Sequence, residues 1–260
     1  MYHPSMLVGW SPDAGELGIK AINFLNRQIG AEDFGDFEPL GFFPLGGVII
    51  EEDVIRFPIS RFFSSESDNL IIFASSQPTS KQYEFLNLVL DVAKEFQVKR
   101  ICTIGGLISK TIAHTEKRKV YSVVNHPGLK MELTKYDMVT DLNYHGSTSM
   151  SGFLLWLAKK REIEALSLWI EVPFYLSSEE DPRATKIILK HLSNMFDLQI
   201  DLSELEQEVR TQEEKIAQLR EANPQINEYI GRLERGKELT EEEEATLTRE
   251  ISGVLKEDWH

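Results

Sequence analysis

The sequence predicts an α/β protein with a mixed, mainly parallel central sheet, helices on both faces and a helical arm at its C-terminal end. Short apolar runs, typical of strands buried on both faces, alternate with segments whose apolar residues keep helical spacing. An aromatic, β-rich stretch near residue 50 interrupts this alternation and makes the sheet mixed. Charged, helix-forming sequence begins at Asp201. We therefore expect an α/β domain over residues 1–200 and an acidic helical arm over residues 201–260.

The chain opens with a strand, a loop and a helix, the order that begins many parallel α/β sheets. Met6–Val8 is the apolar strand, Ser11–Gly15 supplies turn residues, and the helix that follows stops at Gly30. The elements expected next are a hairpin or meander at residues 37–43 and 48–57, a buried strand at 70–74 and a helix at about 80–96.

The segment Lys99–Leu107 is predicted to be a strand in the middle of the sheet. Its apolar residues Ile101–Ile104 run directly into Gly105-Gly106, the pattern of a buried strand that ends in a tight turn. Ligands of open α/β sheets usually sit at the carboxyl ends of central strands, so we expect a crevice here. In the alternative interpretation the two glycines only turn the chain and pack it closely.

The rest of the α/β domain follows from similar patterns. Asp181-Pro182 is typical of a helix start, because proline at the first helical position loses no hydrogen bond. The expected elements are a strand at residues 120–124, a helix at 153–160, a strand at 164–172 and a helix from 182 to 196.

The last 60 residues predict a helical hairpin or a coiled-coil arm. Eight of ten successive a and d positions after Asp201 are apolar, Pro224 interrupts the pattern, and Thr240–Glu243 is a capping box for a final helix. Such a stripe must be buried, either against its own domain or against a second subunit or partner. The residues proposed for this contact are Leu205, Val209, Ile216, Leu219, Ile226, Ile230 and Leu233.

Composition narrows the classes of function. The net charge is −14, and residues 201–260 alone hold 17 acidic and 8 basic side chains. Without a basic patch, nucleic acid is not expected as a partner. No apolar run approaches the roughly 20 residues that cross a bilayer, and the N-terminus lacks the features of a signal peptide, so we expect a cytoplasmic protein without a membrane partner. The single cysteine, Cys102, excludes an intrachain disulfide and is expected to be a buried, inert thiol.

Several candidate site residues follow predicted strands or precede predicted helices. Asp13 is a helix cap candidate and, alternatively, a site residue. His126 either bonds locally in a turn or polarises a ligand, and Ser147 either caps a helix or helps to bind an anion there. Glu171 is costly at the end of a buried strand unless it is paired, hydrogen-bonded or solvated. The full candidate ligand-binding set is Asp13, Gly15, Gly105, Gly106, His126, Ser147 and Glu171.

Common catalytic motifs are missing from the sequence. It contains no Walker A motif, no GxGxxG after the first strand, no GxSxG and no Cys/His cluster with zinc spacing. We therefore assign no catalytic residue, no cofactor and no metal, and we favour a protein that is not an enzyme.

The order of several motifs resembles the proteasome assembly chaperone 2 family of bacteria and archaea. These motifs are WSPDAGELG, TIGGL, NHPG, YHGSTSMSGFLLWLAKKREIEALSLWIEVPFY and DPRATKIILKHL, and the resemblance covers about residues 5–220. It implies a fold akin to the purine and uridine phosphorylases and self-association into homo-oligomers. It also implies a relation to chaperones that help to assemble 20S proteasome α-rings, and hence proteasome subunits as partners.

The end of the chain departs from one feature of such proteins. Assembly factors and activators of this kind can end in a hydrophobic-Tyr-any tripeptide that docks between proteasome α subunits. This chain ends in Asp258-Trp259-His260 and shares only the penultimate aromatic residue.

Two hypotheses about function follow. The first is a non-enzymatic assembly or interaction protein that acts as a homo-oligomer. The alternative is a nucleoside phosphorylase-like or hydrolase-like enzyme or binder that uses the expected crevice. In that case Glu171 would hold a sugar hydroxyl or act as a base, and the amides of Gly105 and Gly106 would hold an anion.

Overall fold

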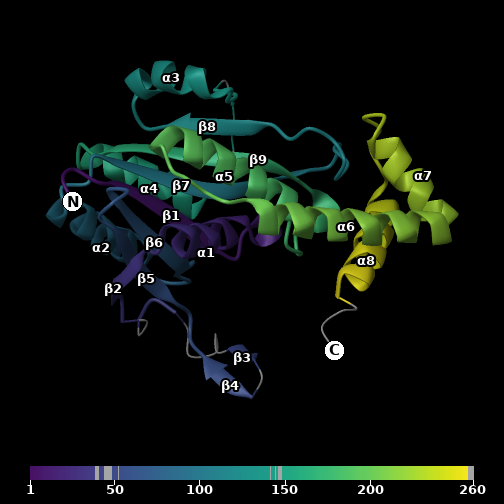
Figure 1. The fold of residues 1–260 in the computed structure, drawn as a ribbon, viewed down its shortest axis with the longest axis horizontal. Coiled ribbons are helices and arrows are strands. Elements are labelled where there is room, and N and C mark those ends of the chain that lie inside the picture. Colours follow the sequence, from purple (N-terminus) through teal and green to yellow (C-terminus); the bar gives the residue numbers. More distant parts are fainter. Residues whose placement is uncertain are drawn as a thin grey trace.

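A computed structural model of the chain describes residues 1–38, 41–43, 49–51, 53–140, 142–143, 145 and 148–256. Its centre is a seven-stranded sheet of order β2-β5-β6-β1-β7-β9-β8, from which a separate β3-β4 hairpin projects (Figure 1). The strands are β1 (Ser5–Ser11), β2 (Glu32–Asp36), β3 (Ile49–Glu51), β4 (Val54–Arg56), β5 (Ser60–Ser65), β6 (Leu70–Ser76), β7 (Arg100–Ser109), β8 (Val120–Val124) and β9 (Glu164–Pro173).

Four of the five interior strands, β6, β1, β7 and β9, run parallel, and β2, β5 and β8 add antiparallel pairs on either side of them. In the register of the parallel core, Leu7 pairs with both Ile72 and Cys102, and Cys102 pairs with Leu166. All four side chains are fully buried. Burial on both faces explains the continuous apolar runs of these strands. The predicted mixed, mainly parallel sheet is thus confirmed.

Helices cover both faces of the sheet. On one face lie α1 (Leu17–Ile29) and α5 (Pro182–Phe196), which share a hydrophobic cluster with Leu7. On the other lie α2 (Gln82–Glu95) and α4 (Met150–Lys160), which pack with Met6 and Val8. Successive residues of a strand point to opposite faces, so β1 serves both layers. The short helix α3 (Pro127–Leu133) lies outside β8 (Figure 1).

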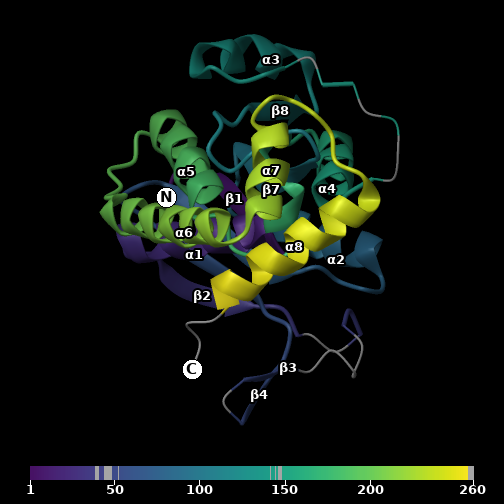
Figure 2. The same cartoon turned by 90° about the vertical axis from the view of Figure 1, so that its right-hand side faces the viewer.

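The C-terminal segment forms α6 (Ser203–Ala222), α7 (Pro224–Leu233) and α8 (Glu241–Lys256), which gather at one end of the molecule (Figure 2). Helix α6 packs along α5, and α8 packs on the 3-10 turn η3 (Phe174–Leu176). The apolar stripe belongs to the same hydrophobic cluster as α1 and α5, which corresponds to burial against its own domain. The division at residue 200 stays a prediction. Of the proposed stripe, Val209 and Leu219 are half-buried and the others are fully buried, namely Leu205, Ile216, Ile226, Ile230 and Leu233.

Local side-chain caps mark where α7 and α8 begin. The Asn223 side chain accepts hydrogen bonds from the amides of Gln225 and Ile226, with Pro224 at the first helical position of α7. The predicted capping box is confirmed, since the Thr240 amide donates to Glu243 Oε2 at 2.8 Å and the Glu243 amide donates to Thr240 Oγ1 at 3.4 Å.

Two predictions about the sheet were wrong. Strand β7 does not turn at Gly105-Gly106 but continues to Ser109, because β9 pairs with it residue by residue over its whole length. The described part of residues 37–43 forms turns and an isolated bridge rather than a strand; the strands β2 and β5 lie outside the predicted hairpin. The second predicted run, 48–57, holds both strands of a hairpin of its own, β3 and β4. Gly46-Gly47 lie outside the described residues.

Two expectations from composition can be compared with the structure. Within the described ranges, no helix is long and apolar enough to cross a membrane. Cys102 is fully buried in β7, and this burial raises the pKa of its thiol to about 12. A thiolate is therefore scarce at neutral pH in the folded chain, as expected of an inert thiol.

The burial of the C-terminal stripe gives a testable prediction. Ile216→Ala should lower the free energy of unfolding by about 2–5 kcal/mol, because it removes apolar contacts and leaves a cavity in the core. Gln218→Ala, on the exposed side of the same turn of α6, is the matched control and should change stability little. Urea unfolding followed by circular dichroism measures both; equal stabilities would show that α6 is not part of the cooperative core.

Candidate functional site

Asp13 lies directly after β1, where the chain turns into α1. The amide of Gly18 donates to both carboxylate oxygens of Asp13, at 3.1 and 3.0 Å, and the amide of Gly106 donates to Oδ2 at 3.3 Å. Burial raises the pKa of the Asp13 carboxyl to about 7, although these amides lower it. Asp13 thus accepts from backbone amides of α1 and β7, while Glu16 occupies the N-cap position of α1.

The glycines at this edge allow close packing. A Cβ at Gly106 would lie 2.3 Å from the backbone oxygen of Ala14, in the 3-10 turn η1 (Ala14–Glu16). Gly15 has a φ of +73° and its amide donates to the oxygen of Ser177 at 3.0 Å. The turn η1 therefore lies against β7 at the position where the crevice was expected. This arrangement matches the packing interpretation of Gly106.

Glu171 lies near the end of β9 and is 9% exposed. Its Oε2 accepts from the Lys119 amide at 2.9 Å, and its Oε1 accepts from the Tyr121 hydroxyl at 3.1 Å. Both carboxylate oxygens thus have partners within the chain, and these partners offset the cost of the buried charge.

A buried ion pair that the sequence did not reveal lies beside these residues. Arg118 and Asp181 have fully buried side chains, and Arg118 Nη1 lies 2.7 Å from Asp181 Oδ2. The same Nη1 donates to the backbone oxygen of Glu171 at 2.9 Å, and Asp181 also caps α5 through the Ala184 amide at 2.9 Å. The Asp181 amide in turn donates to the oxygen of Gly15 at 3.2 Å. The guanidinium therefore links β9 to the start of α5, and the Asp181 backbone links that start to η1.

His114 and Tyr175 extend this polar cluster towards the C-terminal helices. The His114 amide donates to the Tyr175 hydroxyl at 2.7 Å, and His114 Nδ1 lies 2.9 Å from the same oxygen. Burial, together with the nearby Arg220 and Arg118, lowers the pKa of the His114 imidazole to about 4. The imidazole is therefore neutral at physiological pH.

The structure does not bring all candidate site residues together. His126 caps α3, and its ring accepts from the Gly128 amide at 3.2 Å. It follows β8, which is antiparallel to β9, and so lies beside the start of β9, about 20 Å along the sheet from Glu171. The prediction that His126 shares a crevice with Asp13 was wrong, because the antiparallel edge strand reverses the direction of the chain. Ser147 lies outside the described residues; the neighbouring Ser149 caps α4.

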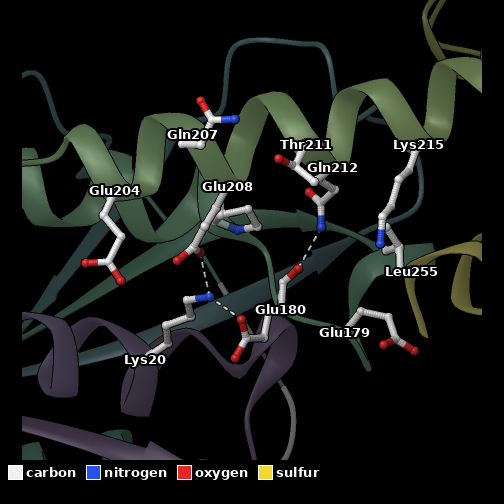
Figure 3. A pocket seen from close by; sticks show the side chains of 11 residues that line it. Lys20, Glu179, Glu180, Glu204, Gln207, Glu208, Thr211, Gln212, Lys215 and Leu255 are labelled. Atoms are coloured by element: carbon white, nitrogen blue, oxygen red, sulfur yellow. Dashed lines mark hydrogen bonds and ion pairs between the residues drawn. The ribbon is translucent and has the colours of Figure 1, made fainter. Parts of the chain in front are cut away.

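A groove of about 590 Å³ lies elsewhere, between α1, α6 and the start of α5 (Figure 3). Lys20 lies within it and forms ion pairs with Glu180 and, at 2.8 Å, with Glu208. The Gln212 side chain donates to the oxygen of Glu180 at 2.8 Å. The candidate residues Asp13, Gly106 and Glu171 do not line this groove. That the candidate ligand-binding set binds a ligand stays a prediction.

The chemistry available at the carboxyl edge is limited by these contacts. The Arg118 guanidinium bonds to Asp181 and to backbone carbonyl oxygens, the Asp13 and Glu171 carboxylates accept from backbone amides, and the His114 imidazole contacts the Tyr175 hydroxyl. Among the residues that the structure describes, no three His, Cys, Asp or Glu side chains form a group that could hold a metal ion. Burial raises the pKa of the Asp13 carboxyl to about 7, so this carboxyl changes its charge near neutral pH.

Known proteins share this architecture. The fold is that of an α/β protein with a mixed sheet between helical layers, and the model of the PAC2 family matches residues 6–220. The chain belongs to the PAC2 family. A relative, an uncharacterized protein of Methanocaldococcus jannaschii, is 23% identical over 221 residues, which is 83% of each chain.

Two solved structures resemble this chain over most of its length. Pyrococcus furiosus PbaB, an archaeal proteasome activator, is 22% identical with a TM-score of 0.73 and covers 85% of this chain and 94% of its own. PbaA of the same organism, an archaeal homolog of proteasome-assembly chaperone, is 24% identical with a TM-score of 0.69 and covers 90% and 93%. At these identities the likeness establishes the shared fold.

The two perturbed groups at the sheet edge predict opposite effects of pH. Folding raises the pKa of Asp13 from 3.8 to about 7. The protonated Asp13 therefore adds stability at pH values below 3.8, and this contribution is lost as the pH rises to about 7. The lowered pKa of His114 stabilises the fold above 6.5, and this contribution is lost as the pH falls to about 4. Asp13→Asn should therefore gain stability relative to the wild type as the pH rises from 4.5 to 7.5. Urea unfolding at both pH values tests this, with the exposed Asp36→Asn as control; a pH-independent difference contradicts it.

Proposed function

We propose that this chain is a non-enzymatic assembly or interaction protein that self-associates in the cytoplasm and binds proteasome subunits. The observation that carries the proposal is the PAC2 family match over residues 6–220, together with the likeness to a proteasome activator and to a homolog of a proteasome-assembly chaperone. The engagement of Arg118, Asp181 and Glu171 with one another and with the backbone supports a structural rather than a catalytic sheet edge.

The charge of the chain indicates what kind of partner surface it fits. A net charge of −14 favours a basic patch on the partner and disfavours an acidic one. Exposed acidic residues gather in the first turn of α8, where Glu241 and Glu242 follow Thr240. Association with a basic surface is faster at low ionic strength, since salt screens the attraction.

One observation supports the alternative function, a phosphorylase-like or hydrolase-like enzyme or binder. Asp13 and the Gly106 amide lie in contact, and the Asp13 carboxyl can exchange a proton near pH 7. His126, which also belongs to the candidate ligand-binding set, caps α3 beside the start of β9, at the amino ends of the parallel strands.

The proposed function predicts the outcome of affinity capture. The full-length tagged chain, expressed in its source cells, should recover proteasome α subunits at low salt and less of them as salt is raised. An unrelated protein of the same pI, about 5.0, controls for retention by charge alone. Identification by mass spectrometry decides the result: recovery of no proteasome subunit, or equal recovery by the control, contradicts the proposal.

A further inference from the structure

The outward face of α2 and α4 exposes large apolar side chains. Tyr83 on α2 is 55% exposed and Trp156 on α4 is 53% exposed, and Leu88 on α2 is 38% exposed. The Phe153 ring lies between the two larger side chains, with its centroid 6.5 Å from that of Tyr83 and 6.0 Å from that of Trp156. Tyr83, Phe153 and Trp156 form one aromatic cluster that spans both helices, and Leu88 adds exposed apolar surface on α2. We call this exposed surface the α2–α4 face.

Tyr83 and Trp156 lie outside the buried cluster that holds the two helices on the sheet, whereas the Phe153 ring also packs against that cluster. The inner sides of the helices carry separate, buried residues, including Phe85 and Leu86 on α2 and Leu154 and Ala158 on α4. Arg161, at the end of α4, joins the two helices through its ion pair with Asp91. Exposed aromatic area that the fold does not use is typical of an interaction site.

The charges beside the aromatic residues differ between the two helices. Helix α2 exposes Glu84, Asp91 and Glu95, with Lys94 as the one exposed cation of its last turn, whereas α4 exposes Lys159 and Lys160. Lys160 Nζ lies 5.4 Å from the centroid of the Trp156 ring. The two helices run in the same direction, because α2 leads into β7 and α4 leads into β9 of the parallel core.

We infer that the α2–α4 face binds a second copy of this chain, with a twofold axis that runs parallel to the two helices. This rotation places the basic α4 of one copy against the acidic α2 of the other, twice, and brings the aromatic residues together at the centre. A partner of uniform charge would be opposed by one half of the face, whereas a second copy complements both halves. The inference rests on the self-association in the proposed function and names its surface.

A charge-swap experiment tests this interface. Lys159→Glu/Lys160→Glu makes both helices acidic, and Glu84→Lys/Glu95→Lys makes both basic. Each variant alone should dimerise about tenfold more weakly than the wild type or worse, because like charges then face each other. An equimolar mixture of the two variants should recover a dimer, now of unlike chains. Sedimentation velocity at about 0.15 M salt measures all three samples. At this salt concentration surface charges still act over about 8 Å.

An apolar variant gives a second, independent readout. Trp156→Glu should yield a monomer at concentrations at which the wild type is a dimer, since it places an unpaired charge at the centre of the contact. Met131→Ser is the matched control, because Met131 is 81% exposed on α3, away from this face, and the variant should dimerise normally. Circular dichroism confirms that each variant is folded.

Two outcomes would overturn the inference. If the wild-type chain stays monomeric at all concentrations, it does not self-associate and the inference fails. A dimer that survives Trp156→Glu and both charge variants, or a mixture that does not recover one, shows that another surface is used. Affinity capture of proteasome subunits is measured separately, so failure of this interface is distinguishable from failure of the proposed partner.

Discussion

The buried ion pair between Arg118 and Asp181 organises the carboxyl edge of the sheet. Both side chains are fully buried, so neither charge is compensated by water, and each depends on the other and on nearby backbone groups. Through this pair the segment after β7 is joined to β9 and to the start of α5. The amide of Asp181 then fixes η1, which lies on Gly106. The edge at which many α/β proteins bind ligands is here occupied by the chain's own turn.

The C-terminal helices complete this edge, and much of their acidity is used within the chain. Helix α6 forms ion pairs with α1 and α5, including Lys20 with Glu208 at 2.8 Å and Lys186 with Glu206 at 2.9 Å. These pairs are partly exposed and each contributes little to stability. They join α6 to α1 and α5, while residues such as Ile216 supply apolar burial. The acidic sequence after Asp201 thus serves packing as well as surface charge.

The sequence was sufficient for the parallel core and for the helical C-terminal segment, because burial on both faces and helical spacing leave strong patterns. It was not sufficient at Gly105-Gly106, since a glycine that permits close contact within a strand looks the same as one that ends it. The position of His126 depended on the direction of β8, which no local pattern determines. Arg118 lies between Lys117 and Lys119, and nothing in such a basic cluster separates a buried arginine from an exposed one.

We propose that the carboxyl edge of the sheet is a packed structural element rather than a ligand site. Thermal unfolding of the full chain with millimolar nucleosides, nucleotides or inorganic phosphate tests it most directly. We predict an unchanged melting temperature. A ligand present at 100 times its Kd would add about 2.7 kcal/mol and raise the melting temperature by roughly 5–10 °C. A rise of that size that is lost in Asp13→Asn would contradict the claim and restore the edge as a ligand site.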